Sequence, residues 1–150
     1  MPISLNFNTW KLFIKIMEEY EMDNTYQDIE KTKDSYMIKD KNGKIVSKFN
    51  YYDYKLKNFD WVLIANLDTK PAHRGKGLAT SLINELYKDV STKTKKGLYL
   101  SVKPNNRNAI RLYTKLKFKK VKTYTSKGTE YIIMAKGNAD KNQFDKMNFG

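Results

Sequence analysis

The spacing of apolar residues along the chain predicts a helical segment near the N-terminus. Residues 3–7 fit a short strand that precedes it. Apolar residues then recur three and four positions apart, as on one face of a helix: Trp10, Phe13, Ile14, Met17 and Tyr20. Asn8 or Thr9 is the expected N-cap of this helix. A second, weaker helix is expected over about 24–32, where only two apolar residues anchor the pattern.

The period then changes to that of strands. Two runs of strand-forming residues, 35–39 and 44–49, flank a turn that contains Asn42 and Gly43. Asn-Gly between such runs is typical of a β-hairpin, because a type I′ turn needs positive φ at both central residues. The next run, 59–67, is mostly apolar, which predicts a central strand that is buried on both faces.

The second half of the chain alternates between the spacing typical of helices and the spacing typical of strands. After a loop over 68–74, an apolar stripe predicts a helix that begins near residue 78: Leu78, Leu82, Ile83, Leu86 and Val90. A strand over 98–102 and a helix over 106–116 follow, and the final pair of strands is expected at about 118–125 and 130–136. This order predicts a mixed sheet with helices packed on it.

One domain over residues 1–136 and a polar tail over 137–150 account for the chain, since no linker or internal repeat interrupts it. Phe144, Met147 and Phe149 are the apolar residues by which the tail could dock.

Composition limits the chemistry. The chain has 150 residues, no cysteine and one histidine, His73, so disulfides, thiolate nucleophiles and a His-rich metal centre are not expected. We expect no metal ion. No apolar run is long enough to span a membrane, and the N-terminus lacks the layout of a signal peptide, so we expect a cytoplasmic protein.

The net charge of +13 is uneven along the chain. Residues 1–60 hold ten Lys/Arg and ten Asp/Glu, whereas residues 61–150 hold nineteen and six. A half this basic favours an anionic partner, such as a phosphorylated cofactor, a nucleic acid or an acidic protein. A composition rich in Lys, Asn, Tyr and Ile explains many of the lysines equally well without any partner.

A glycine-containing segment between the buried strand and the amphipathic helix is the clearest candidate for chemistry. It comprises Arg74, Gly75, Lys76, Gly77, Leu78 and Ala79. A helix N-terminus offers unpaired main-chain N–H groups to an anion, and glycines let a phosphate approach them closely. The segment is neither a Walker A loop nor a dinucleotide-binding G-x-G-x-x-G. A plain glycine-rich connection with surface cations remains the alternative for this segment alone.

A second segment extends the pattern. Together with the loop, Asn106, Ala109, Leu112, Tyr113 and the following Phe118 resemble the GNAT superfamily of acyl-CoA-dependent N-acetyltransferases. In the loop the resemblance is carried by Arg74, Gly77 and Ala79, with Pro71 shortly before. Lys117 departs from the family pattern, which usually has glycine there.

The resemblance implies a GNAT-like α/β (α+β) fold. Its mixed, mostly antiparallel sheet would have about six to seven strands, with helices on both faces and splayed central strands. It also implies that acetyl-CoA is the co-substrate, with its pyrophosphate on the amides of residues 75–79 and Arg74 beside them. Main-chain groups near Leu67 and Thr69 would polarise the thioester carbonyl, and Asn106 would contact the pantetheine arm.

The same resemblance implies that Tyr113 is the general acid that protonates the departing thiolate, although a core aromatic residue explains its place equally simply. A general base must take the proton of the amine. Asp60 is the carboxylate nearest to the family's usual position, and Asp68 and His73 are alternatives.

The resemblance predicts an N-acetyltransferase that moves an acetyl group to a primary amine by direct attack in a ternary complex. The acceptor would be a small molecule, a protein lysine or a protein N-terminus. Two other functions fit the sequence: a catalytically silent CoA-binding module, and a basic domain that binds a nucleic acid or an acidic protein. A sheet edge or the tail could pair two protomers into a homodimer. No membrane partner is expected.

Overall fold

The structure is a computed structural model that describes residues 6–23, 25–54, 60–92, 97–137 and Phe144. Its elements follow in this order: α1 (Phe7–Asp23), β1 (Glu30–Lys31), β2 (Ser35–Lys39), β3 (Ile45–Tyr52), β4 (Trp61–Thr69), the 3-10 helix η1 (Pro71–His73), α2 (Leu78–Ser91), β5 (Gly97–Val102), α3 (Arg107–Lys115), β6 (Lys119–Ser126) and β7 (Thr129–Gly137). The hairpin, the central helix and all strands predicted after residue 34 are therefore confirmed.

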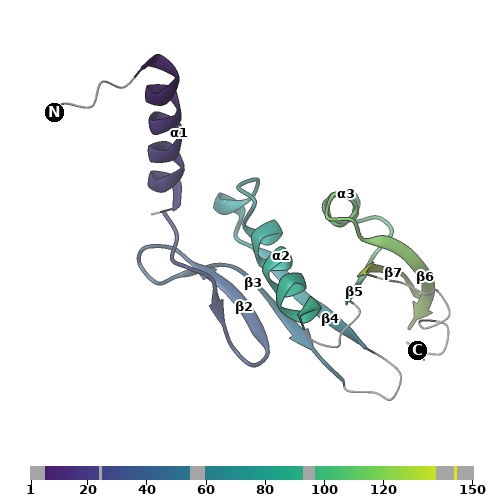
Figure 1. Cartoon of the computed structure of the whole chain (residues 1–150). Helices are drawn as coiled ribbons and strands as arrows, with labels where there is room; N and C mark the ends of the chain where they lie inside the picture. Colours follow the sequence, from purple (N-terminus) through teal and green to yellow (C-terminus); the bar gives the residue numbers. More distant parts are fainter. Residues whose placement is uncertain (1–5, 24, 55–59, 93–96, 138–143, 145–150) are drawn as a thin grey trace.

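The strands form one sheet in the order β1-β2-β3-β4-β5-β7-β6 (Figure 1). Neighbouring strands are antiparallel, except that β4 and β5 are parallel. A parallel pair needs a crossover, and helix α2 provides it. The mixed, mostly antiparallel sheet predicted from the sequence is confirmed.

The two parallel strands separate soon after they meet. β4 and β5 pair only over Trp61–Leu63 and Gly97–Tyr99. Beyond that point β4 stays paired with β3 as far as Thr69, while β5 stays paired with β7 as far as Val102. The central strands are thus splayed, as the family resemblance implies.

A bulge interrupts β4 just before its end. Lys48 pairs with Asp68 and Asn50 pairs with Ala65, so Asn66 and Leu67 together lie opposite a single residue of β3. Asn66 has φ 57°, in the left-handed region that asparagine tolerates better than most residues.

The two faces of the sheet carry separate apolar clusters. Helices α2 and α3 both bury residues in the larger cluster, in which Leu82, Ile83 and Tyr113 pack with the strands. The smaller cluster lies on the other face, where Phe144 covers Trp61 and Tyr99. Within the described residues, the two helices that pack on the sheet therefore share one face. On the opposite face, Phe144 covers Trp61 and Tyr99, which confirms this predicted docking point. Met147 and Phe149 lie outside the described residues.

The N-terminal predictions need correction. Phe7 begins a helix instead of ending a strand, and the rest of the expected strand lies outside the described residues, apart from Asn6. Asn6 caps α1, because its Oδ1 accepts a hydrogen bond from the Thr9 main-chain N–H at 2.8 Å. The apolar side chains at the start of α1 are exposed, and the helix projects from the sheet (Figure 1).

No helix forms over the described residues 25–32, which overturns the second prediction for this region. The Gln27 N–H donates to the Lys39 carbonyl at 2.8 Å, Tyr26 bridges to Asp40, and the short strand β1 pairs with β2. Bonds to the neighbouring strand have replaced the local bonds of a helix.

The central strand also differs from the expectation of full burial. Trp61, Val62 and Ile64 are buried, whereas Asn66 and Asp68 near the end of the strand are exposed. The far end of β4 is thus accessible. Among the described residues, no helix combines the length and the apolar character needed to cross a membrane.

Candidate active site

A cleft of about 790 Å³ lies beside the accessible end of β4. Its walls come from the end of β4, the loop before α2, the start of α2 and one side of α3. The predicted site residues that line it are Leu67, Thr69, Arg74, Gly75, Gly77, Leu78, Ala79, Asn106 and Tyr113. The structure thus brings together residues that are up to 46 positions apart in the sequence, in a volume typical of small-molecule sites.

Two glycines shape the loop at the start of α2. Gly75 has φ 76° and Gly77, the N-cap of α2, has φ 78°, a conformation that residues with a Cβ rarely adopt. A Cβ at either position would meet no atom within 4 Å, so the space beside both glycines is open. No side chain caps α2, and its first main-chain N–H groups are available to an anion.

Arg74 is held beside this helix end. Its Nε donates to the Thr69 carbonyl at 3.0 Å, which ties the loop to the end of β4. Thr69 is fixed in turn by a 2.8 Å hydrogen bond between its hydroxyl and that of Ser47, which is buried in β3. A positive charge therefore has a defined place next to the open helix terminus, an arrangement that suits a phosphate group.

Asn106 forms the opposite wall of the cleft. It is the N-cap of α3, and its Oδ1 accepts a hydrogen bond from the Ala109 main-chain N–H at 3.2 Å. This bond uses the side-chain carbonyl for the helix, which leaves the amide NH₂ group as the part of Asn106 that can donate to a ligand.

Tyr113 lies two turns further along α3. Its side chain is only 8% exposed, it lines the cleft, and its ring packs against Phe118 with the centroids 5.7 Å apart. Burial raises the pKa of Tyr113 above its ordinary value of 10.0. The phenol is therefore protonated throughout the physiological pH range and can donate a proton.

Lys117, between Tyr113 and Phe118, adopts φ 73°. Glycine adopts this conformation without strain, which explains why the family pattern has glycine at this position. The departure noted in the sequence thus affects the turn into β6 and leaves the cleft wall intact.

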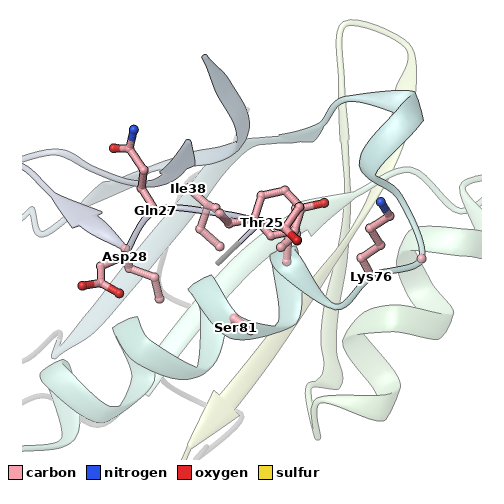
Figure 2. A pocket seen from close by; sticks show the side chains of 10 residues that line it. Thr25, Gln27, Asp28, Ile38, Lys76 and Ser81 are labelled. Atoms are coloured by element: carbon pink, nitrogen blue, oxygen red, sulfur yellow. The ribbon is translucent and has the colours of Figure 1, made fainter. Parts of the chain in front are cut away.

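Lys76 is the one predicted loop residue that does not line the cleft. It lines a neighbouring groove of about 780 Å³ together with residues 25–29 and the start of α2. Figure 2 shows Lys76 on the loop before α2, with Thr25 and Ile38 nearby and Ser81 on the helix. Lys76 therefore lines the neighbouring groove and not the cleft.

The three candidate bases are separated by the fold. Asp60 precedes β4 and is adjacent to buried Trp61, at the end of the strand remote from the cleft, so the structure does not bring it to the site. Asp68 and His73 both line the cleft. Asp68 is exposed and forms a 3.8 Å ion pair with Lys70. The His73 Nδ1 is 2.9 Å from the Tyr26 hydroxyl.

Two features of the site were not foreseen. The bulge at Asn66 places Leu67 on the face of the helices, and the Tyr26–His73 hydrogen bond ties the N-terminal segment to the loop. An asparagine inside an otherwise apolar strand was the available signal for the bulge. Among the described residues, no three His, Asp or Glu side chains are placed to hold a metal ion.

Comparisons with known proteins agree with this geometry. Residues 6–118 match the sequence model of the Acetyltransferase (GNAT) family. The fold is similar to that of Arabidopsis thaliana NAA60 in complex with acetyl-CoA, at 23% sequence identity and a TM-score of 0.59, over 71% of this chain and 78% of that chain.

It is also similar to the ribosomal-protein-S18-alanine N-acetyltransferase from Escherichia coli, at 19% identity and a TM-score of 0.57, over 98% of this chain and 97% of that chain. A third similar structure is the IAA acetyltransferase from Bacillus cereus, at 14% identity and a TM-score of 0.56, over 69% and 76% of the two chains. At these identities the structural likeness concerns the fold. No curated protein sequence matches the chain.

Proposed function

Because this chain belongs to the GNAT family of acetyl-CoA-dependent N-acetyltransferases, we propose that its cleft binds acetyl-CoA and transfers the acetyl group directly to a primary amine. The observation that carries the proposal is the convergence of an uncapped helix end, two left-handed glycines and a protonated tyrosine on one cleft. The acceptor is an amine of a small molecule, of a protein lysine or of a protein N-terminus.

The loop before α2 is the proposed diphosphate site. The main-chain N–H groups of residues 75–79 are proposed to bind the diphosphate at the helix terminus, where the helix dipole adds about half a positive charge. Arg74 adds a full charge, and its link to Thr69 keeps the guanidinium near the loop. The open space beside Gly75 and Gly77 lets phosphate oxygens approach the backbone closely.

The bulge in β4 supports a second role. A bulge leaves one residue out of the regular hydrogen-bond ladder, and here it lies at Asn66 and Leu67. We propose that main-chain groups near Leu67 and Thr69 hold the pantetheine arm and polarise the thioester carbonyl, and that the Asn106 amide also contacts the arm. Donors that are fixed before the reaction stabilise developing negative charge without reorganising.

Tyr113 is the proposed general acid. In the transfer, the amine nitrogen forms a bond to the carbonyl carbon while the carbon–sulfur bond breaks, and Tyr113 supplies the proton that the departing sulfur takes up. The pKa of a thiol is about 8.5 and that of Tyr113 lies above 10, so Tyr113 donates its proton while the carbon–sulfur bond breaks and negative charge develops on the sulfur. The proton that the amine loses in the same reaction passes from its acceptor through solvent to the phenolate and restores the phenol.

Asp68 is the proposed acceptor of that amine proton, because it is the carboxylate that lines the cleft. His73 is the other group with a suitable chemistry, and its link to Tyr26 holds the ring near the loop. The two are distinguished by the rates of transfer in single variants: Asp68→Asn should lower the rate while His73→Gln keeps it, and the opposite outcome would assign the amine proton to His73.

Residues 1–136 are proposed to form the catalytic domain, with residues 137–150 as a tail that is attached to it by Phe144. The packing of Phe144 on Trp61 and Tyr99 supports this division.

A thermal-shift assay with acetyl-CoA tests the binding step. Ligand at 100 times its dissociation constant stabilises a protein by ~2.7 kcal/mol, which corresponds to roughly 5–10 °C for a chain of this size. Gly77→Glu should abolish the shift, because its carboxylate would occupy the place of a phosphate. Gly77→Ala is the matched control, since it imposes a similar backbone strain without the charge.

A wild-type protein that shows no shift at millimolar acetyl-CoA would refute the binding proposal. Binding without thiol release, measured across a panel of amines, peptides and tRNA, would instead support the silent-module alternative.

A further inference from the structure

The basic charge of the chain is concentrated in one continuous stretch. Residues 90–129 contain twelve Lys/Arg and no Asp or Glu. A composition that favours lysine everywhere explains abundant lysines, but it does not explain the loss of acidic residues, because residues 1–60 hold equal numbers of both. The asymmetry therefore calls for a local cause.

In the structure, many of the described cations of this stretch are exposed on α3, on β6 and in the turns beside α3, at the end of the molecule away from α1 (Figure 1). The exposed cations on α3, in the turns beside it and at the start of β6 are Lys103, Arg107, Arg111, Lys115, Lys117, Lys119 and Lys120, and we call this set the α3–β6 basic surface. Lys119 and Lys120 are consecutive in β6 and lie on opposite faces of the sheet, so they form its edge. Within the described part of the chain, every ion pair involves Lys31, Lys39 or Lys70. None of these seven cations therefore forms an ion pair with another described residue.

The arginines point to the chemistry of the partner. The chain has 29 Lys/Arg but only three arginines, namely Arg74, Arg107 and Arg111. Arg74 lies at the proposed diphosphate loop, and the other two lie one helical turn apart on α3. A guanidinium binds two oxygens of a phosphate or carboxylate at once, which lysine does not.

The spacing suits a polymeric anion. Arg107, Arg111 and Lys115 are four residues apart, so they follow one another at about 6 Å along the helix. Arg107 and Arg111 do not line the cleft, whereas Lys115 does. The row of cations therefore begins on the outer side of α3 and ends at the cleft.

The surface lacks what a protein partner would need. Protein interfaces have an apolar centre inside a polar rim. Among the described residues, the large exposed apolar side chains belong to α1 and to Tyr52 and Tyr54, and none belongs to α3 or β6. A strongly basic surface without an apolar centre is typical of contact with a phosphate backbone.

We propose that the α3–β6 basic surface binds the phosphate backbone of a nucleic acid. The contact is independent of sequence, because phosphates carry no base information. It places the bound strand beside the cleft, with Lys115 shared between the two.

Fluorescence anisotropy with a labelled single-stranded RNA of about 20 nucleotides, and with DNA of the same sequence, tests the proposal in the absence of acetyl-CoA. The wild-type protein should bind both, with an affinity that falls steeply between ~50 and 200 mM salt. The double variant Arg107→Gln/Arg111→Gln should bind at least about tenfold more weakly at ~100 mM salt. Its salt slope should also be smaller by about 1.4, for two lost phosphate contacts on a single strand.

The matched control is Lys41→Gln/Lys44→Gln, which removes the same charge from the exposed β2–β3 turn. It should bind like wild type. Equal weakening of both double variants, or absence of binding at 50 mM salt, would overturn the proposal. So would competition by polyglutamate as effective as that by RNA, which would indicate an acidic protein partner.

The coenzyme offers another phosphate, and one arm of the test addresses it. The Arg107→Gln/Arg111→Gln variant should keep the wild-type thermal shift with acetyl-CoA. If the shift falls, and the difference from wild type vanishes with dephospho-CoA, the arginines serve the 3′-phosphate of the coenzyme and the proposal is wrong. Since RNA binding is measured without the coenzyme, failure of the proposed acetyltransferase activity would leave this result unaffected.

Discussion

Phe144 provides a quantitative test of how the C-terminal segment is held. Its side chain is 0% exposed, its ring lies 5.1 Å from that of Trp61 and 5.6 Å from that of Tyr99, and its carbonyl accepts a 3.4 Å hydrogen bond from Lys122. Replacing a fully buried phenylalanine by alanine costs about 3–5 kcal/mol, part of it from the lost aromatic pairs. For a 150-residue chain, each kcal/mol changes Tm by about 3 °C.

Phe144→Ala should therefore lower Tm by roughly 10–15 °C in a thermal melt followed by circular dichroism. A chain that ends at Gly137 should show a similar loss, because Phe144 is the described contact of the tail. Phe144→Leu is the control, since it keeps most of the apolar volume and should cost less than about 1.5 kcal/mol. A Tm for Phe144→Ala within about 3 °C of wild type would show that this ring does not cover the sheet in solution.

Three further results are expected. Gly97→Ala should prevent stable folding, because its Cβ would lie 2.0 Å from the Lys136 carbonyl oxygen; a soluble variant with a wild-type melt would contradict the close packing of β5 and β7. Tyr113→Phe should slow thiol release about 100-fold or more while acetyl-CoA binding is kept. The turnover of the wild-type protein should show no decline below pH 10, since burial raises the pKa of Tyr113. Hydrogen bonds, the strongest of them from Lys31, lower the pKa of Asp89 below 3.8. The ionised Asp89 therefore stabilises the folded protein above that pH, and this stabilisation is lost as the pH falls further. Asp89→Asn should flatten the urea-midpoint profile between ~pH 2 and 5, and an unchanged profile would refute that role.

Elements with a strong period were predictable from the sequence. The stripe from Leu78 to Val90 packs on the sheet as α2, because five apolar residues on one side leave a helix a single way to bury them. Asn42 and Gly43 form the turn between β2 and β3 for a similarly local reason, but only Gly43 takes a positive φ, of 84°, so the turn is not the type I′ turn that Asn-Gly predicts.

The segment over 24–32 was not predictable in this way. Tyr26 and Ile29 fit a helical spacing, but two anchors define no stripe. Their position was decided by partners distant in sequence: Tyr26 bonds to His73, and the neighbouring Gln27 bonds to Lys39. Tertiary contacts commonly override weak helical propensity.

For the candidate site, the sequence predicted the residues of the loop and of α3 that line the cleft, whereas the predicted base Asp60 does not line it. The loop, Asn106 and Tyr113 belong to short sequence motifs that can be recognised without knowing where the neighbouring strands begin or end. The position of Asp60 depended on where β4 begins and on which end of it faces the cleft. The sequence of a strand does not show which of its two ends lies beside a cleft, because the elements that pack against each end decide this.

The bulge at Asn66 changes which side chains of β4 face the helices. Before it, even-numbered Val62 and Ile64 face α2 and α3; after it, odd-numbered Leu67 does. Deleting Asn66 would remove the bulge and leave Leu67 alone opposite Phe49, so Leu67 and Thr69 would keep their faces by regular alternation. The bulge thus separates the part of β4 that packs in the core from the part that lines the cleft. A library that varies residues 67–69 should leave the fold intact while altering what the cleft accepts.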